Sequence, residues 1–171
     1  MAEHLQSYVD VDTPALLLDL DQAERNIERY QRLAGESGIA LRPHAKAHKT
    51  VEVGRRQIAA GAVGVCCAKL AEAEALAELG NILVTTPLIG ALKIRRLIEL
   101  ARRTQVVLVV DDAANIAELS AAASGARLAF DVVVDVDVGQ ARTGVPPGPK
   151  AAELATLIKR SAGLRFRGVQ G

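Results

Sequence analysis

The segment LRPHAKAHK, residues 41–49, carries cationic or titratable side chains at alternating positions. In a β-strand this spacing puts Arg42, His44 and Lys46 on one face. Parallel strands in α/β proteins are covered on both faces, so three such groups on one face are costly without anionic partners. A phosphorylated cofactor would supply the anion. The alternative is an exposed edge strand with a solvated polar face, and the residues alone leave both interpretations open.

Lys46 stands at the carboxyl end of this predicted strand, the end at which barrel enzymes place their active sites. We expect it to be desolvated among other cations, which lowers the pKa of a lysine and leaves some neutral amine to form a Schiff base. Pro43 has no N–H to donate, so irregular pairing is expected beside it. His48 is expected to support the site from the following loop, and Lys69 to be solvated.

The segment DVVVDVDVGQARTGV, residues 131–145, holds the second group. Asp131, Asp135 and Asp137 share one face of a predicted strand, and Gly139 allows a sharp turn where the strand ends. Arg142 follows in the loop, where its planar guanidinium could hold a phenolate oxygen or a substrate carboxylate. It could equally pair with an aspartate of the same strand end. The aspartates come from one strand without a second ligand group, so we assign no metal ligand.

Three residues at other strand ends are weaker candidates. Gln170 ends the last predicted strand and could reach a cofactor, although a surface position is equally compatible with the sequence. Thr85 and Thr86 end an earlier strand and are expected to cap the following helix.

Short β-branched runs alternate along the chain with Ala/Leu-rich segments of helical spacing, which predicts βα units and a parallel sheet. We expect an α/β fold, an incomplete (β/α)₈ TIM-type barrel with about six βα units. The chain ends directly after a strand and is shorter than a barrel, so we expect a fragment; an open sheet is the alternative. Predicted strands cover 15–18, 40–46, 64–68, 82–86, 106–110, 129–138 and 164–170. Predicted helices run from 19 or 21 to 35–38 and over 51–60, 70–79, 91–102, 113–123 and 149–161.

Composition excludes several functional classes. A formal net charge of +1 offers no basic surface for nucleic acid or an anionic membrane. No apolar run approaches the roughly 20 residues of a membrane span, and the polar segment MAEHLQSYVDVD does not resemble a signal peptide. Cys66 and Cys67 are adjacent on a predicted strand and cannot easily bridge, so we expect two structural thiols in a cytoplasmic protein.

The chain resembles the fold-type III pyridoxal-phosphate enzymes, the alanine-racemase-like barrels, and in particular the D-threonine aldolase and D-serine dehydratase family. The resemblance covers nearly the whole chain and is most distinctive in RPHAKAHK and AGAVGVCCAKLAEAEAL; TPALLLDLDQAERNI, DVDVGQARTGV and LRFRGVQG also match. It implies that Lys46 carries pyridoxal 5'-phosphate (PLP) and that Arg142 lies near the ring oxygen. It also implies that His44 lines the pocket and that Gln170 lies under or beside the ring.

The resemblance further implies a PLP-dependent lyase for D-β-hydroxy-α-amino acids, with D-threonine aldolase activity expected first. A D-serine dehydratase or racemase of the same fold, a non-catalytic PLP-binding protein and an inactive fragment are the alternatives. Residues 1–171 would be a partial PLP-binding barrel domain. The full-length family member would add the rest of the barrel, a C-terminal β-domain and a divalent metal (Mn, Mg or Zn), and would form a homodimer.

Overall fold

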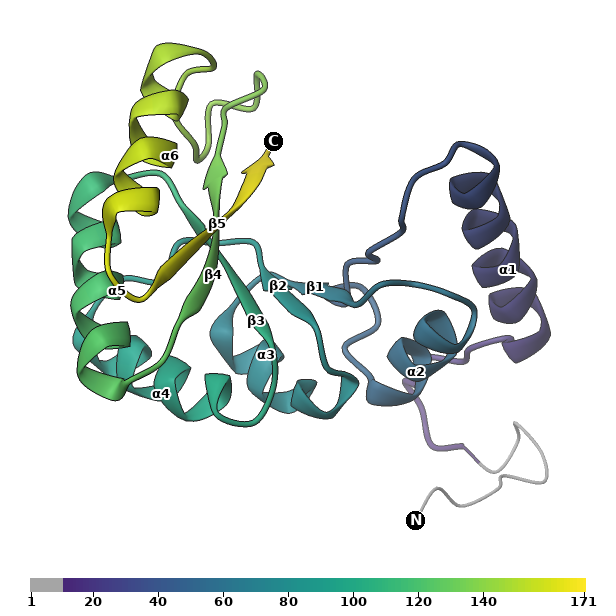
Figure 1. The fold of residues 1–171 in the computed structure, drawn as a ribbon. Helices are drawn as coiled ribbons and strands as arrows, with labels where there is room; N and C mark the ends of the chain where they lie inside the picture. Colours follow the sequence, from purple (N-terminus) through teal and green to yellow (C-terminus); the bar gives the residue numbers. More distant parts are fainter. Residues whose placement is uncertain (1–10) are drawn as a thin grey trace.

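The computed structural model describes residues 11–171 and shows a sheet of five parallel strands whose spatial order follows the sequence. Parallel neighbours need crossover connections, and helices supply them (Figure 1). The predicted fold class is confirmed, because this is part of a parallel βα barrel. His4 and the other residues of 1–10 lie outside the described part. The strands are β1 (Val65–Cys67), β2 (Ile82–Val84), β3 (Val106–Val110), β4 (Phe130–Asp135) and β5 (Leu164–Gln170).

The first two helices begin close to their predicted positions because the sequence supplies side-chain caps there. Asp19 accepts a hydrogen bond from the Gln22 amide at 2.9 Å, and Thr50 caps the second helix in the same way. The pair α1 and α2 lies at the β1 end of the sheet, and α6 lies beside β5 (Figure 1). The helices are α1 (Leu20–Glu36), α2 (Val51–Ala59), α3 (Leu70–Ala75), α4 (Ala91–Ala101), α5 (Ala113–Ala126) and α6 (Pro149–Arg160).

The core lies between the sheet and the helices α3 to α6. Alternate strand residues point toward the helices and are completely or almost completely buried. Leucines and isoleucines of the helices fill the space between them, so aliphatic burial supplies most of the stabilisation. The strand side chains of this core include Val65, Cys67, Ile82, Val84, Leu108, Val110, Val132 and Val134.

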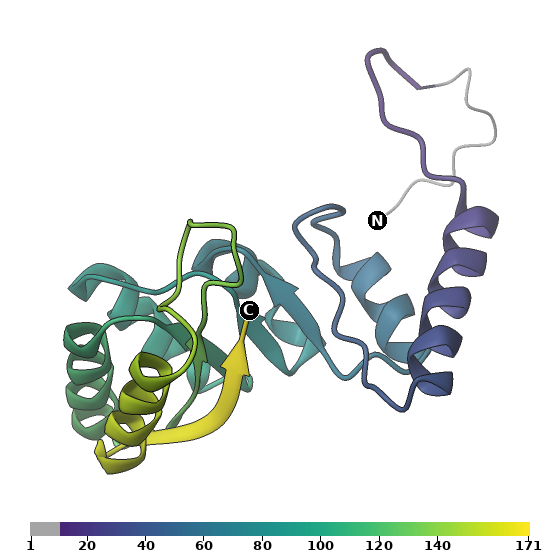
Figure 2. The same cartoon turned by 90° about the horizontal axis from the view of Figure 1, so that it is seen from above.

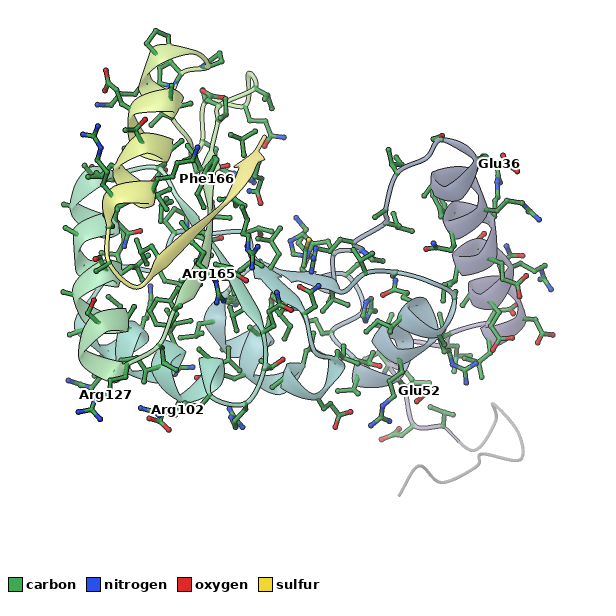
Figure 3. All side chains as sticks on the ribbon, viewed as in Figure 1. Glu36, Glu52, Arg102, Arg127, Arg165 and Phe166 are labelled. Atoms are coloured by element: carbon green, nitrogen blue, oxygen red, sulfur yellow. The ribbon has the colours of Figure 1, made fainter. Side chains whose placement is uncertain are left out.

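The opposite face of the sheet is polar near the amino ends of β4 and β5. Asp131 is 1% exposed and accepts hydrogen bonds from the Nε atoms of Arg165 at 2.6 Å and Arg167 at 2.9 Å. Gln105 adds a third bond to the same carboxylate at 3.2 Å. Arg165 is labelled on β5 in Figure 3. Burial raises the pKa of Asp131, but the bonds from Arg167, Arg165 and Gln105 outweigh it, so the net effect lowers that pKa below its usual value.

The predicted strand 40–46 is not a regular strand. Only His44 of this segment forms a bridge, and its partner is Cys66 of β1. In this bridge the Cys66 amide donates to the Pro43 carbonyl at 2.7 Å, and the Ala45 amide donates to the Cys66 carbonyl at 2.8 Å. A longer ladder would next need an N–H on residue 43, and proline has none. The irregular pairing expected at Pro43 is therefore confirmed, and the strand length was wrong.

The predicted opening strand 15–18 was also wrong. These residues have no regular secondary structure, and Leu16, Leu17 and Leu18 are exposed, because no neighbouring strand pairs with them in the described part of the chain. The apolar side chains of α1 are mostly unburied as well: Ala34 is its one buried residue, and Tyr30 is exposed. Seen from above, α1 stands on the outer side of α2 (Figure 2).

Three smaller expectations were also wrong. The helix predicted over 70–79 is interrupted at Leu76 and continues as a 3-10 turn, η2 (Ala77–Leu79). The helix predicted over 113–123 continues to Ala126 as α5 and ends on Arg127 in the left-handed conformation. Thr85 and Thr86 do not cap α4, whose capping position is Gly90.

Candidate functional site

Lys46 follows the bridge to β1 and lies at the carboxyl edge of the sheet. Its backbone amide donates to His44 Nδ1 at 3.2 Å, while the preceding Ala45 is buried and accepts from the Lys49 amide at 2.7 Å. The Lys46 side chain is exposed and has no hydrogen-bond or ion-pair partner in residues 11–171. The structure therefore fixes the backbone of this lysine and leaves its amine accessible. The expected desolvation of Lys46 is wrong for this structure, because only one side of the segment is covered.

Hydrogen bonds hold the His44 ring at both nitrogens. Nδ1 accepts from Lys46, and Nε2 lies 3.4 Å from Thr85 Oγ1. The Thr85 hydroxyl donates to the Cys67 carbonyl at 3.2 Å, so its oxygen is left to accept a proton from His44 Nε2. This network assigns His44 the neutral tautomer protonated on Nε2. Burial and the nearby Lys46 charge lower the pKa of His44, partly opposed by Glu72, which favours the same neutral form.

His48 stabilises the loop between Lys46 and α2. Its Nδ1 accepts from the Thr50 amide at 3.2 Å, and Thr50 Oγ1 in turn accepts from Val53 at the start of α2. Burial lowers the pKa of His48, so the ring is neutral and can accept this bond. Lys49, between them, has a φ of 53°, an unusual conformation for a residue with a Cβ. The expected supporting role of His48 agrees with these contacts.

Arg42 does not share an anion site with His44 and Lys46. Its Nη1 donates to the Asn81 carbonyl at 2.9 Å and the Asn81 side-chain oxygen at 3.0 Å, at the amino end of β2. His44, by contrast, contacts Thr85 at the carboxyl end of that strand. A Cβ on Gly64 would lie 2.5 Å from the Arg42 guanidinium, so glycine at this position makes room for the arginine. Arg42 is therefore a structural residue.

Arg142 and Gln170 line one small pocket at the carboxyl ends of β4 and β5. The pocket has a volume of about 80 Å³ and also includes Asp135, Asp137 and Thr143. Gln170 Nε2 donates to Asp135 Oδ1 at 3.3 Å, whereas Asp135 Oδ2 is buried without a partner in the described residues. Arg142 is exposed and pairs with no carboxylate in residues 11–171. The alternative of an arginine paired with its own strand end is therefore not what the structure shows.

The three aspartates of this segment have separate roles. Asp131 binds the arginines of β5, and Asp135 binds Gln170. Asp137 Oδ1 accepts from the Gly139 and Ala141 amides at 2.9 and 3.1 Å. Within residues 11–171, no three His, Cys, Asp or Glu side chains gather as a possible metal site.

The structure thus joins Lys46 with His44, and Arg142 with Gln170, but it shows no contact between the two pairs. Strands β1, β2 and β3 separate them along the carboxyl edge. Both pairs leave groups that suit an anionic carbonyl compound: an accessible amine on one side and an unpaired guanidinium on the other.

Two residues that hold these side chains in place were missed by the sequence reasoning. Thr85 was expected to cap a helix but contacts His44. Asp111, the residue after β3, accepts from the Gly144 amide at 3.0 Å and had no assigned role. Its position one residue beyond a buried strand is the signal that could have identified it. Both thiols are free: Cys67 is buried and Cys66 partly so, as expected of structural cysteines.

None of the helices described for residues 11–171 combines the length and apolar character needed to cross a membrane.

Comparison with known proteins adds independent findings. Residues 18–171 match the family described as alanine racemase, N-terminal domain. The chain is 41% identical over 162 residues to D-threonine aldolase of Arthrobacter sp, covering 94% of this chain and 43% of that protein. It is 34% identical over 168 residues to D-threo-3-hydroxyaspartate dehydratase of Delftia sp. (strain HT23), covering 93% and 43%. The crystal structure of D-threonine aldolase from Filomicrobium marinum superposes with a TM-score of 0.93 at 42% identity, covering 95% of this chain and 45% of that one. The chain thus spans less than half the length of these relatives.

Proposed function

The chain belongs to the alanine racemase N-terminal domain family, and we propose that its protein is a PLP-dependent lyase acting on D-β-hydroxy-α-amino acids. The substrate we propose is D-threonine, with glycine and acetaldehyde as products. The D-threonine aldolases among the similar proteins support this choice. The observation that carries the proposal is the placement of Lys46, an accessible amine on a fixed backbone at the carboxyl edge of a parallel sheet.

The residues present fit PLP. The cofactor is an aldehyde with anionic substituents, so it needs an amine that it can reach and cationic or N–H donors for its oxygens. Lys46 would hold the aldehyde carbon, and Arg142 is a guanidinium whose donors no described carboxylate occupies. When bound, PLP supplies an electron sink for bonds at the substrate Cα.

The chain's own residues would then bind and orient. Neutral His44, hydrogen-bonded to Thr85, would hold the Lys46 backbone in register and line the pocket. Arg142 would bind the ring oxygen or the substrate carboxylate, and Gln170, fixed by Asp135, would lie beside the ring. The Lys46 amine would carry a proton near Cα, since it is a mobile base at the end of a flexible stem.

A second candidate is a dehydratase, favoured by the 34% identity to D-threo-3-hydroxyaspartate dehydratase. Both reactions start from the same class of substrate and differ in which bond at Cα or Cβ breaks. A racemase of the same fold and a non-catalytic PLP-binding protein are the remaining alternatives. The products formed from D-threonine and D-serine distinguish all four.

We further propose that the complete protein is a cytoplasmic homodimer and that its activity requires Mn²⁺, Mg²⁺ or Zn²⁺. The described side chains do not fit a metal site, so no step is assigned to the metal. Loss of activity in a chelator and recovery on adding one of these ions would test the requirement.

The test uses the complete gene product that carries this sequence, incubated with PLP and D-threonine. We expect release of acetaldehyde and glycine, abolished by Lys46→Ala and by Lys46→Arg. Lys69→Ala is the matched control, because Lys69 is also exposed at the carboxyl edge, after β1, and its side chain caps nothing. Pyruvate from D-serine without acetaldehyde from D-threonine would select the dehydratase. Cofactor binding without any turnover would select the non-catalytic alternative.

A further inference from the structure

The loop that carries Arg142 leaves and rejoins the same short stretch of backbone. Val136 and Val145 form an isolated bridge, with the Asp137 amide donating to the Val145 carbonyl at 2.9 Å and the Val145 amide to the Asp135 carbonyl at 3.0 Å. Residues 137–144, the Arg142 loop, therefore form a closed excursion from the end of β4. The position of Arg142 depends on the shape that this excursion takes.

One carboxylate fixes the first half of the Arg142 loop from within. Asp137 Oδ1 accepts from the Gly139 and Ala141 amides, and these bonds lower the pKa of Asp137. Ala141, the residue before the arginine, has a φ of 51°, which a side chain bearing a Cβ adopts only when its surroundings impose it. The backbone is thus constrained immediately before Arg142.

A second carboxylate, from a different strand, fixes the other half. Asp111 follows β3 directly, is partly buried, and its Oδ2 accepts from the Gly144 amide at 3.0 Å. Gly144 has a φ of 95°, and a Cβ there would lie 2.6 Å from the Asp137 nitrogen. The two carboxylates therefore hold the loop on either side of the arginine, and of these two it is Asp111 that connects the loop to the end of β3.

We propose that Asp111 is a positioning residue for Arg142: its bond to the Gly144 amide holds the Arg142 loop in the shape that presents the guanidinium to the pocket. This inference rests on the proposed function only for what Arg142 binds. The carboxylate is a charged acceptor, so its bond to an N–H is stronger than one from a neutral oxygen. Asp111→Asn keeps the size and removes the charge, and Asp111→Ala removes the acceptor.

The first test does not depend on activity. Trypsin cleaves after arginine, and cleavage at Arg142 requires the Arg142 loop to open. In the complete gene product we expect Asp111→Ala to accelerate cleavage at Arg142 about tenfold, equivalent to about 1.4 kcal/mol, and Asp111→Asn less. Arg127, exposed at the end of α5 (Figure 3), serves as the internal control site. Equal acceleration at both arginines, or none at Arg142, would overturn the proposal.

The second test asks whether Asp111 acts through Arg142. We expect Asp111→Asn to weaken PLP or substrate binding several-fold in the parent protein, and to have no further effect in an Arg142→Ala background. Additive losses would contradict the inference. Asp21→Asn, an exposed carboxylate in the first turn of α1, is the matched control. If Lys46 proves dispensable while Asp111 still protects the loop from trypsin, the proposed function fails and the positioning role stands.

Discussion

Replacing Asp131 by asparagine should destabilise the sheet more than any other single loss of charge described above. The carboxylate is 1% exposed and accepts from both Arg165 and Arg167. Asparagine has the same shape, so the substitution removes the charge without opening a cavity. In the variant, Arg165 and Arg167 face a neutral amide, whereas in the wild type they pair with a charged carboxylate.

The size of the effect follows from the exposure of the partners. A hydrogen bond to a charged group contributes about 1.5–3 kcal/mol, and a buried carboxylate more when its partner is lost. The side chains of Arg165 and Arg167 are 53% and 51% exposed, so water partly solvates them and the lower end of that range, about 1.5 kcal/mol for each arginine, applies. We therefore expect a loss of about 2–3 kcal/mol for Asp131→Asn. Arg167→Met should cost only about 1 kcal/mol, because Arg165 still pairs with Asp131.

The pH dependence has a definite sign. Because the net effect of its surroundings lowers the pKa of Asp131 in the folded protein, its contribution is complete above the unfolded value of about 3.9 and is lost as the pH falls below it. The difference in free energy of unfolding between the wild type and Asp131→Asn should therefore be constant around neutral pH and become smaller toward about pH 3.

Urea unfolding of the complete gene product, followed by circular dichroism, measures this difference. With a slope of about 1.5–2 kcal/mol per molar urea, the midpoint should fall by about 1–2 M in Asp131→Asn. Asp21→Asn should not change it. An unchanged midpoint in Asp131→Asn at neutral pH, or a difference in midpoint that persists undiminished in acid, would show that the Asp131 charge does not stabilise the sheet.

Three further predictions concern other parts of the structure. Gly144→Ala should reduce activity and lower the melting temperature more than Gly148→Ala. Both glycines have a positive φ, 95° and 97°, but of the two only Gly144 is placed so that a Cβ would meet backbone atoms within 3 Å. Equal effects of the two substitutions would exclude this clash. Burial lowers the pKa of both His44 and His48 below 6.5, so the unfolded chain binds protons at a higher pH than the folded protein does, and stability should fall as the pH drops through about 6.5. Over the same pH range the urea midpoint should fall less in a His44→Asn/His48→Asn variant. An equal fall of the midpoint in the wild type and the variant would contradict this. Burial raises the pKa of Cys66 and raises that of Cys67 to about 12. A thiol reagent at about pH 8 should therefore react slowly with Cys66 and hardly at all with Cys67 until urea is added. Rapid labelling of Cys67 in the native protein would be inconsistent with the structure.

The sequence predicted the regular parts of the fold because these depend on local pattern. The strand β3 was located to the residue, since a short, mostly β-branched apolar run between polar segments favours a strand over a helix. Helix α2 begins at Val51, as predicted, and α1 begins at Leu20, between the two predicted starts; in the structure Thr50 and Asp19 cap them. The strand predicted over 40–46 was too long. The alternating pattern of this segment is that of a strand, but Pro43 has no N–H to continue the hydrogen-bond ladder with β1.

The candidate site was predictable in composition but not in its contacts. Lys46, His44, Arg142 and Gln170 all lie at the carboxyl edge, as strand ends require. That Arg42 binds Asn81 while His44 binds Thr85 could not be anticipated, because it depends on how two strands are aligned in register. Asp111 could have been singled out by its position directly after a buried strand, but its partner could not, because Gly144 is distant in sequence and reaches it only through the fold of the Arg142 loop.

The proposed function depends on the Lys46 amine as the group that holds the cofactor. The most direct measurement is borohydride reduction of the complete protein in the presence of PLP, followed by peptide mass mapping. We expect a phosphopyridoxyl group on the peptide containing Lys46, with Lys49 and Lys69 unmodified. Modification of another lysine, or of none, would contradict it.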